Sequence, residues 1–141
     1  MTINEVQFSD EISIEEYNNL RKSVGWLKLT ETQAKKVLER STSIVCGRID
    51  NQIVAMGRVN FDGYIAFIAD IVIVPEYQRR GLGTWIVEKL IATVLEEVET
   101  NQHIQFILIA AAKKEPFYES IGFSKCPSGQ FGAGMRKVIK K

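Results

Sequence analysis

The sequence is poor in the residues from which metal centres and disulfide frameworks are built. It contains two cysteines, Cys46 and Cys126, without a Cys-x-x-Cys spacing, and its single histidine is His103. Structural zinc sites need four such ligands, and small disulfide-bonded domains need several cysteine pairs. The composition therefore argues against a metal site and gives no disulfide framework. Cys46 lies within an apolar run, which favours a small buried core residue.

Long apolar runs and an excess of one charge are also missing. The apolar stretch 64–74 is shorter than the ~20 residues of a membrane-spanning helix, and the N-terminus has no basic segment followed by an apolar one. With 18 basic and 17 acidic residues, the net charge of +1 provides no field that would attract nucleic acid or an anionic membrane. We expect a cytoplasmic protein of one domain, because 141 residues suffice for one full core.

The first half of the chain alternates helical and strand patterns. Residues 3–8 predict a short strand. Two capping-box patterns, each a hydroxyl residue followed three positions later by Glu or Gln, predict helices over 13–25 and 30–40. Turn residues then separate three successive strands, which predicts an antiparallel meander over 44–49, 53–59 and 64–74.

The third of these strands leads into the most informative stretch of the chain. Its apolar run contains one carboxylate, Asp70, and ends at Pro75, which has no N–H for a sheet ladder. A polar turn with Arg79 and Arg80 follows, and Gly81-Leu82-Gly83 opens a helix-periodic segment. The first N–H groups of a helix lack partners and favour anions, and glycine allows a ligand to approach closely. The pattern predicts a phosphate-binding loop.

The remaining chain predicts one more crossover and a hairpin. An almost wholly apolar strand is expected over 103–111, as in a sheet covered on both faces. A short helix follows from Lys114, with Gly122 as the residue after its C-cap. A flexible connection over 129–134 and a last strand over 135–139 complete the expected order.

Two blocks of this sequence resemble the GNAT superfamily of acyl-CoA-dependent N-acetyltransferases. Gln78-Arg79-Arg80-Gly81-Leu82-Gly83 is similar to the family's Gln/Arg-x-x-Gly-x-Gly/Ala signature, and Phe117-Tyr118-x-x-x-Gly122-Phe123 resembles its second block. The resemblance covers about 43–123. It implies one domain over 1–141 with a mixed α/β fold, in which about four helices flank a twisted, mostly antiparallel sheet. It also implies acetyl-CoA as cosubstrate and no metal.

The resemblance carries the cosubstrate contacts onto two adjoining segments. The loop amides would bind the pyrophosphate, and the end of the preceding strand would pair with the pantetheine arm like an added strand. In the family this strand separates from its neighbour at a bulge. The residues concerned are Ile71, Val72, Ile73 and Val74 in the strand and Arg79, Arg80, Gly81, Leu82, Gly83 and Thr84 in the loop.

The same resemblance suggests the residues that handle protons. Tyr118 corresponds to a tyrosine that protonates the leaving thiolate, although a core aromatic is the alternative. Asp70 is the candidate base, because a carboxylate among apolar residues is costly unless it is paired. A structural ion pair is an equal alternative for Asp70, and a water chain is another candidate base. His103 stands at a strand start, where a surface position is expected.

The acceptor is the least determined part. Trp26, Met56, Arg58 and Phe67 are candidates for its pocket, with packing or, for Arg58, a surface ion pair as the alternative. The stretch 68–74 also resembles the glucosamine-6-phosphate branch of the family, but 110–114 lacks the acidic groups suited to that sugar. The segments 55–58 and 132–135 resemble small stand-alone bacterial members.

The function expected from the sequence is transfer of acetyl from acetyl-CoA to a primary amine of a small molecule, by direct attack in a ternary complex. Acetylation of a protein lysine or N-terminus is one alternative, and a longer acyl group is another. A CoA-binding sensor or interaction protein without turnover is the rival from outside the enzymes. Homodimers are common in the resembled family, and neither nucleic acid nor membrane is expected as a partner.

Overall fold

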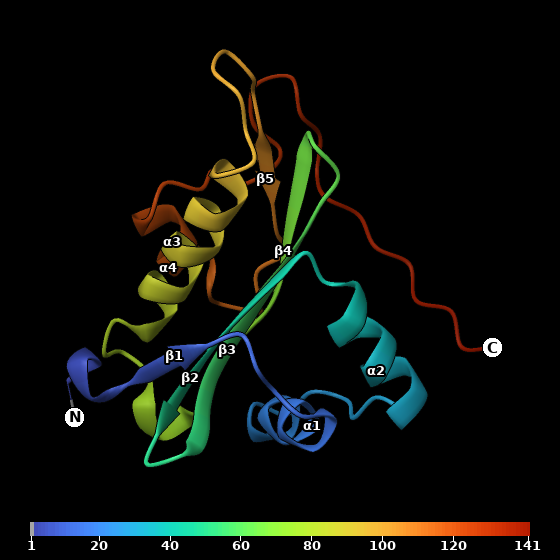
Figure 1. Ribbon diagram of the computed structural model, residues 1–141. Helices are drawn as coiled ribbons and strands as arrows, with labels where there is room; N and C mark the ends of the chain where they lie inside the picture. The colour runs from blue at the N-terminus through green and yellow to red at the C-terminus, as the bar shows by residue number, and fades with distance from the viewer. Residues whose placement is uncertain (1) are drawn as a thin grey trace. The chain divides into compact units, whose positions relative to one another are not determined.

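The computed structural model describes residues 2–141, which form two compact units, residues 2–107 and Leu108–Lys141. The first unit is built on one five-stranded sheet with the spatial order β1-β2-β3-β4-β5 (Figure 1). Its strands are β1 (Gln7–Ser9), β2 (Ser43–Ile49), β3 (Gln52–Phe61), β4 (Ile65–Ile73) and β5 (Gln105–Ile107). Because spatial order follows chain order, short connections suffice for the first four strands.

The sheet is mostly antiparallel, and the predicted meander is confirmed. β1 to β4 pair antiparallel in succession, and only β5 runs parallel to its neighbour β4. The β2–β3 turn consists of Asp50 and Asn51, whose φ angles of 49° and 64° are those of a two-residue hairpin turn. The parallel pair requires the long crossover that the chain makes between β4 and β5.

The helices of the first unit begin where the sequence predicted. α1 (Ile14–Ser23) starts with a full capping box, in which the side chains of Ser13 and Glu16 each accept from the other's backbone N–H. α2 (Glu31–Arg40) is capped by Thr30, whose hydroxyl accepts from the N–H of Gln33. The 3₁₀ turns η1 (Ile3–Glu5) and η2 (Pro75–Tyr77) and the helix α3 (Leu82–Leu95) complete the unit.

Two adjacent residues of β3 show that the helices cover opposite faces of the sheet, because neighbouring side chains on a strand point to opposite sides. Met56 is fully buried in a cluster with residues of α1 and α2. Gly57 faces α3 so closely that an added Cβ would lie 2.6 Å from a methyl carbon of Ile86. Cys46 belongs to the Met56 cluster, so its predicted core position is confirmed.

Three strand predictions need correction. Residues 3–8 form η1 and then only the start of β1, and the strand expected over 103–111 is reduced to β5. β5 is short because it pairs with β4 only over Ile65–Phe67. The last strand expected over 135–139 is absent: this segment pairs with no strand of the described residues, and a strand requires a bonded neighbour.

The second unit contains one helix, α4 (Glu115–Ser120). Gly122 follows it with φ of 103°, and the N–H groups of Gly122 and Phe123 donate to the carbonyls of Glu119 and Tyr118. This is the glycine-terminated helix end that the sequence predicted, since a left-handed residue there closes the last carbonyls. The ring of Tyr118 packs edge-on against Phe117 and Phe123, with centroid distances of 4.9 and 5.9 Å.

Candidate active site

A β-bulge interrupts β4 at Asp70. Met56 of β3 pairs with Val72 and Arg58 pairs with Ala69, so Asp70 and Ile71 together lie opposite the single residue Gly57. Asp70 has a φ of 52°, which is unusual for a residue with a side chain. The bulge thus turns the Asp70 carboxylate toward α1, while Ile71 faces α3, where its Cδ1 lies 2.6 Å from the position of an added Gly57 Cβ.

Beyond the bulge, β4 has an unpaired edge. β5 bonds to β4 only over Ile65–Phe67, and no other strand within residues 2–141 pairs with the rest of that edge. The N–H of Val74 donates to Val54 on β3 at 2.9 Å. Because bonding directions alternate along a strand, the backbone groups of Ile71 and Ile73 point to the open side. Apart from the Ile73 carbonyl, which accepts a hydrogen bond from the Gln78 side chain, this edge is available to an extended chain that carries amides.

A hydrogen bond to β4 fixes the conformation of the loop that follows this strand. The side-chain amide of Gln78 donates to the carbonyl of Ile73 at 2.9 Å. Arg79 and Gly81 have φ angles of 62° and 89°, so left-handed residues recur through the turn. Such alternation directs successive N–H groups into one concavity, an anion-binding nest.

Six successive N–H groups of this loop have no partner. For residues 79–84, the structure of the described chain contains no backbone or side-chain acceptor bonded to the main-chain N–H. The first bonded N–H of α3 is that of Trp85, which donates to the carbonyl of Gly81 at 3.1 Å. The guanidinium of Arg80 lies 5.6 Å from the ring centre of Tyr77. The loop combines free donors, positive charge and a helix N-terminus, which suits a diphosphate.

The carboxylate of Asp70 is the centre of a polar cluster on the α1 face. Oδ2 accepts from the Tyr17 hydroxyl at 2.5 Å and from Arg58 Nε at 2.7 Å, while Oδ1 accepts from Arg21 Nη1 at 2.9 Å. The Asp70 side chain is 8% exposed. Burial, and then the hydrogen bond to Asp70, raise the pKa of Tyr17 to about 12. This arrangement is the ion pair that the sequence left open for Asp70.

The other candidate acceptor residues lie in different surroundings. Met56 is fully buried, and Trp26 packs against the same cluster while the Arg21 guanidinium lies 5.6 Å from its ring centre. Phe67 is 37% exposed and pairs across the sheet with Asn60. Opposed residues share a face, as do residues two apart, so Phe67 lies on the same face as Arg58.

Tyr118 belongs to the second unit and lies on α4. Burial raises the pKa of its phenol, so the hydroxyl keeps its proton at neutral pH. His103 is exposed, as expected. Among residues 2–141, no three His, Cys, Asp or Glu side chains gather as metal ligands, and none of the helices has both the length and the apolar character to cross a membrane.

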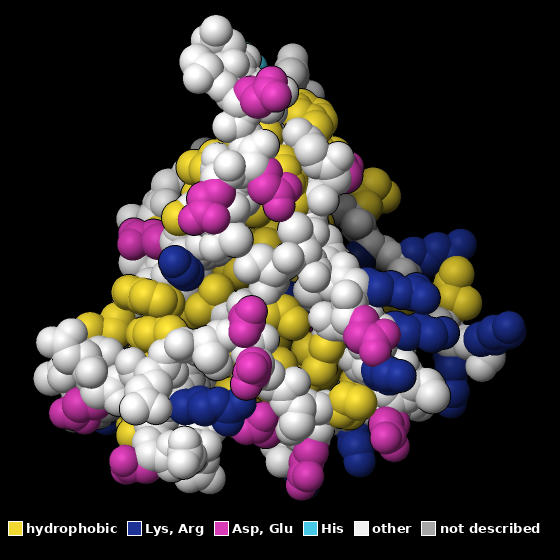
Figure 2. Space-filling model, in the orientation of Figure 1, with side chains coloured by type: hydrophobic (Ala, Val, Ile, Leu, Met, Phe, Trp, Pro, Cys, Tyr) yellow, Lys and Arg dark blue, Asp and Glu magenta, His cyan; other side chains and the backbone are white. Residues whose placement is uncertain are grey.

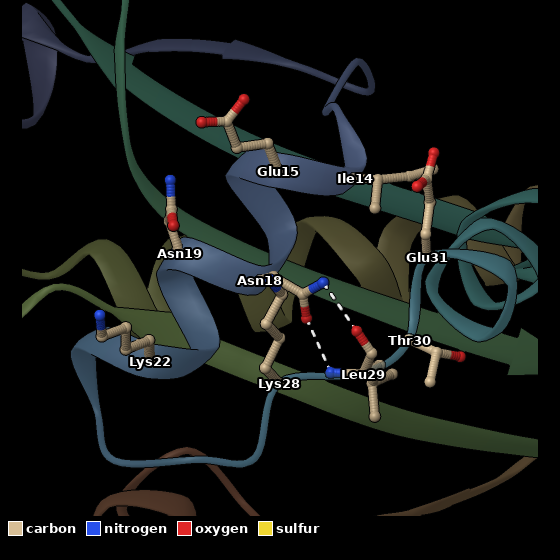
Figure 3. A pocket seen from close by; sticks show the side chains of 9 residues that line it. All are labelled: Ile14, Glu15, Asn18, Asn19, Lys22, Lys28, Leu29, Thr30 and Glu31. Atoms are coloured by element: carbon tan, nitrogen blue, oxygen red, sulfur yellow. Dashed lines mark hydrogen bonds between the residues drawn. The ribbon is translucent and has the colours of Figure 1, made fainter.

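A separate hollow of about 560 Å³ lies outside the sheet, between α1 and the segment that leads into α2. Figure 3 shows Asn18 pointing toward Leu29, whose carbonyl and N–H it binds at 3.1 and 2.9 Å. This paired amide stabilises the loop, and the other side chains around it are mainly exposed and of both charges. The face shown in Figure 2 also carries both acidic and basic side chains. Neither feature singles out a ligand.

Two cluster residues were missed by sequence reasoning. Tyr17 and Arg21 both reach Asp70 from α1. Their separation of four residues puts them on one helix face, and this spacing is the one signal that was present. The spacing did not reveal the partner, because Arg21 and Tyr17 lie 49 and 53 residues from Asp70 in the sequence.

Comparison with known proteins relates the sequence to one family. A model of the "Acetyltransferase (GNAT) domain" matches residues 15–139. An uncharacterized N-acetyltransferase, ycf52, of Pyropia yezoensis is 30% identical, over 93% of this chain and 80% of its own. The histone acetyltransferase TAP1 of Glycine max is 27% identical, over 91% of this chain and 60% of its own.

A solved structure extends the match to three dimensions. SA2161 of meticillin-resistant Staphylococcus aureus, described as a probable acetyltransferase, superposes with a TM-score of 0.80 and is 28% identical. The superposition covers 95% of this chain and 99% of SA2161. With a family model over most of its length, a bulged β4 and a loop of free amides, the chain belongs to the GNAT family of acetyltransferases.

Proposed function

We propose that the protein transfers the acetyl group of acetyl-CoA to a primary amine of a small molecule, by direct attack in a ternary complex. The observation that carries this proposal is the run of six free N–H groups at 79–84 beside the unpaired edge of β4. A diphosphate and an extended amide-containing arm are the two chemical features of CoA that these two elements suit.

The cosubstrate contacts follow from the two elements. The amides of residues 79–84 bind the pyrophosphate, Arg79 and Arg80 add positive charge, and Thr84 adds a hydroxyl. The arm pairs with the outward backbone groups of β4 between the loop and the bulge. The thioester then lies near Asp70 and Ile71, at the end of the open edge. We further propose that the two units act as one N-acetyltransferase domain over 1–141, since the family model spans both.

The transfer itself exchanges one bond for another. The neutral amine nitrogen attacks the thioester carbon, a C–N bond forms, and the C–S bond then breaks. An outward N–H of Ile71 or Ile73 stabilises the oxyanion, because a backbone donor fixed in a strand needs no reorganisation. Tyr118 gives its proton to the leaving thiolate as general acid. The proton lost by the amine goes to solvent water, and the Tyr118 phenolate regains a proton from solvent before the next turnover.

For Asp70 we propose an anchoring role in place of the base. Its carboxylate already accepts three hydrogen bonds, two of them from guanidinium groups. A general base needs an oxygen that faces the amine, and here both carboxylate oxygens are already engaged by donors of the protein, which opposes the base function. Asp70 instead holds Arg21 and Arg58 in fixed positions.

The experiment that tests the function measures release of free CoA thiol from acetyl-CoA across amines, polyamines, amino sugars, amino acids and lysine peptides. Release above the no-acceptor rate with a small-molecule class supports the proposal and identifies that class. If no amine of the panel increases thiol release, although calorimetry shows that the protein binds acetyl-CoA, the proposal is contradicted. Another acyl donor or a CoA-binding sensor without turnover is then favoured. Absence of CoA binding would remove the basis of the proposal, the diphosphate loop.

The variant Tyr118→Phe separates an enzyme from a sensor. We expect the turnover rate to fall about 10²–10⁴-fold, the usual contribution of a general acid, while the Kd for acetyl-CoA stays unchanged. Phe117→Leu serves as the control, because it alters a neighbouring ring of α4 without removing a hydroxyl. Equal rates for Tyr118→Phe and the parent would refute the role of Tyr118.

A second candidate function is acetylation of a protein lysine or N-terminus. The observation that favours it is the similarity to a relative named as a histone acetyltransferase, of which this chain spans 60%. The lysine peptides in the panel decide between the two. A kcat/KM for a peptide far above that for every small amine would favour the protein acceptor.

A further inference from the structure

The cluster around Asp70 has a surplus of positive charge. One carboxylate faces two guanidinium groups, those of Arg21 and Arg58, and the third partner, Tyr17, is a neutral phenol. Burial and Asp70 raise the pKa of Tyr17 to about 12, so it adds no negative charge at neutral pH. If the cluster only joined α1 to the sheet, one arginine would be enough to neutralise the charge of Asp70. The second arginine leaves a charge of one unit without a counter-ion.

The donors that carry this surplus are not used by the protein. Arg58 donates to Asp70 through Nε, and within residues 2–141 neither of its terminal nitrogens has an acceptor. Arg21 donates through Nε to the Leu27 carbonyl and through Nη1 to Asp70, which leaves Nη2. No buried side-chain nitrogen or oxygen of the described residues lacks a partner, so these three nitrogens reach solvent.

The two guanidinium groups are held in fixed orientations. Their side chains are only 15% and 17% exposed, and each is bonded to a different oxygen of Asp70. Arg21 also lies over the rings of Tyr17 and Trp26, at 5.8 and 5.6 Å from their centres. Planar guanidinium groups bind carboxylate and phosphate through paired N–H bonds. Because these ones are already ordered, an anion would bind without the entropy cost of ordering a mobile side chain.

The position of the cluster connects it to the transfer reaction. Asp70 directly precedes the open edge of β4 that we assign to the arm of CoA. Arg58 lies on the α1 face with the exposed Phe67 and Asn60 alongside it, so this part of the face is accessible. A molecule whose anionic group meets Arg58 would therefore hold its amine within a few ångströms of the strand where the thioester is expected.

We propose that Arg58 and Arg21 form an anion subsite, and that the acceptor is a small amine that also carries a carboxylate or a phosphate. This inference rests on the proposed function. It makes Arg58 a specificity-determining residue that contacts the acceptor, and it makes Asp70 the residue that positions Arg58. Polyamines and unphosphorylated amino sugars, which carry no anionic group, are then poor acceptors.

The test compares matched amines that differ in the anion alone. Lysine is paired with 1,5-diaminopentane, and phosphoethanolamine with ethanolamine, so the two pairs distinguish carboxylate from phosphate. We expect kcat/KM to be about 10–100-fold higher for the anionic member of at least one pair, mainly through KM, because a charge-assisted contact contributes that much. Equal kcat/KM values within both pairs would overturn the proposal without any variant.

Substitutions at Arg58 and Arg21 test whether the cluster around Asp70 causes the preference for acceptors with an anionic group. Arg58→Lys keeps the positive charge but loses the paired N–H donors of the guanidinium group. The ratio of kcat/KM for the amine with an anionic group to kcat/KM for its partner without one should therefore fall about tenfold or more. Arg48→Lys is the matched control, since Arg48 is also a half-buried arginine paired with a carboxylate, Glu16, and its ratio should stay at the parent value. If Arg58→Lys does not fold, Arg21→Lys replaces it. A ratio unchanged by the cluster variants would overturn the assignment.

A binding measurement keeps this proposal separate from the proposed function. Inorganic phosphate and acetate are titrated by calorimetry into the protein saturated with CoA. If no amine is acetylated but one anion binds the parent and not Arg58→Lys, the transfer reaction is refuted and the subsite stands. If neither anion binds and no amine is acetylated, both are overturned.

Discussion

The hydroxyl of Tyr17 donates to Oδ2 of Asp70 at 2.5 Å, across 53 residues of sequence. Together with the Arg21 contact, this bond connects α1 to β4 at the bulge, and Arg58 adds β3 from the other side. The Asp70 carboxylate therefore connects one helix and two strands. Because Asp70 lies next to the open edge of β4, the strength of its hydrogen bonds affects both the stability of the fold and the geometry of the site.

Tyr17→Phe removes this bond and leaves the ring packing unchanged. We expect a loss of about 1.5–3 kcal/mol in unfolding free energy, the range for a hydrogen bond to a charged group. Chemical denaturation measures it at neutral pH. Tyr64→Phe is the control, because Tyr64 is 56% exposed and makes no side-chain hydrogen bond within the described residues. Equal stability of the two variants would contradict the role of the Tyr17 hydroxyl.

The same bond predicts a loss of stability in alkali. The pKa of Tyr17 rises from 10.0 to about 12 on folding, so between these values the folded state binds more protons than the unfolded state. The stabilisation is thus complete below pH 10 and is lost as pH rises through about 12. In Tyr17→Phe the decline over this window should be shallower than in the parent, as followed by urea unfolding at stepped pH. Parallel curves would refute this.

Glu16 predicts the opposite dependence in acid. Its hydrogen bonds with Arg48 lower its pKa from 4.5 to about 2. The folded pKa lies below the unfolded one, so this stabilisation is present above pH 4.5 and is lost as pH falls toward 2.

The variant Glu16→Gln should lose about 1–3 kcal/mol at neutral pH and show a flatter decline in acid. Glu39→Gln is the matched control, because Glu39 pairs with Lys35 on an exposed helix face. It should cost less than about 0.5 kcal/mol. A Glu39→Gln effect as large as that of Glu16→Gln would show that the burial of the Glu16–Arg48 pair is immaterial. Acid unfolding followed by circular dichroism measures both.

Gly57→Ala probes the close approach of β3 and α3 opposite the bulge. The new methyl would lie 2.6 Å from methyl carbons of both Ile71 and Ile86, so the core must shift. We expect a loss of about 1–3 kcal/mol, as for overpacked cores. Gly132→Ala is the control, since an added Cβ there meets nothing within 4 Å. A thermal midpoint for Gly57→Ala equal to that of Gly132→Ala would contradict the packing.

Gly81→Ala tests the loop. Gly81 has φ of 89°, a left-handed conformation that costs another residue about 1–2 kcal/mol. Gly63, in the β3–β4 turn, has φ of 105° and equally open surroundings. Both alanine variants should lose similar stability, but only Gly81→Ala should raise the Kd for CoA, about tenfold or more, in a calorimetric titration. An equal change of the Kd for CoA in the two alanine variants would contradict a specific role of Gly81 in CoA binding.

Much of the fold could be predicted because its signals act over a few residues. The Ser13 and Thr30 caps, the Asp50-Asn51 turn and Gly122 each satisfy backbone groups next to them in the chain, and each occurs where it was expected. The glycine loop at 79–84 is local in the same sense. Its free amides follow from a helix that begins directly after a turn.

The tertiary structure alone decided which residues meet. Ile107 ends β5 because pairing with β4 stops at Phe67, and residues 135–139 form no strand because no described edge bonds to them, although their own pattern favours one. The partners of Asp70 come from α1 and β3, so they depend on how a helix packs on a bulged sheet. Local pattern specifies backbone conformation over a few residues, whereas an ion pair between distant residues exists only after the core has brought their elements together.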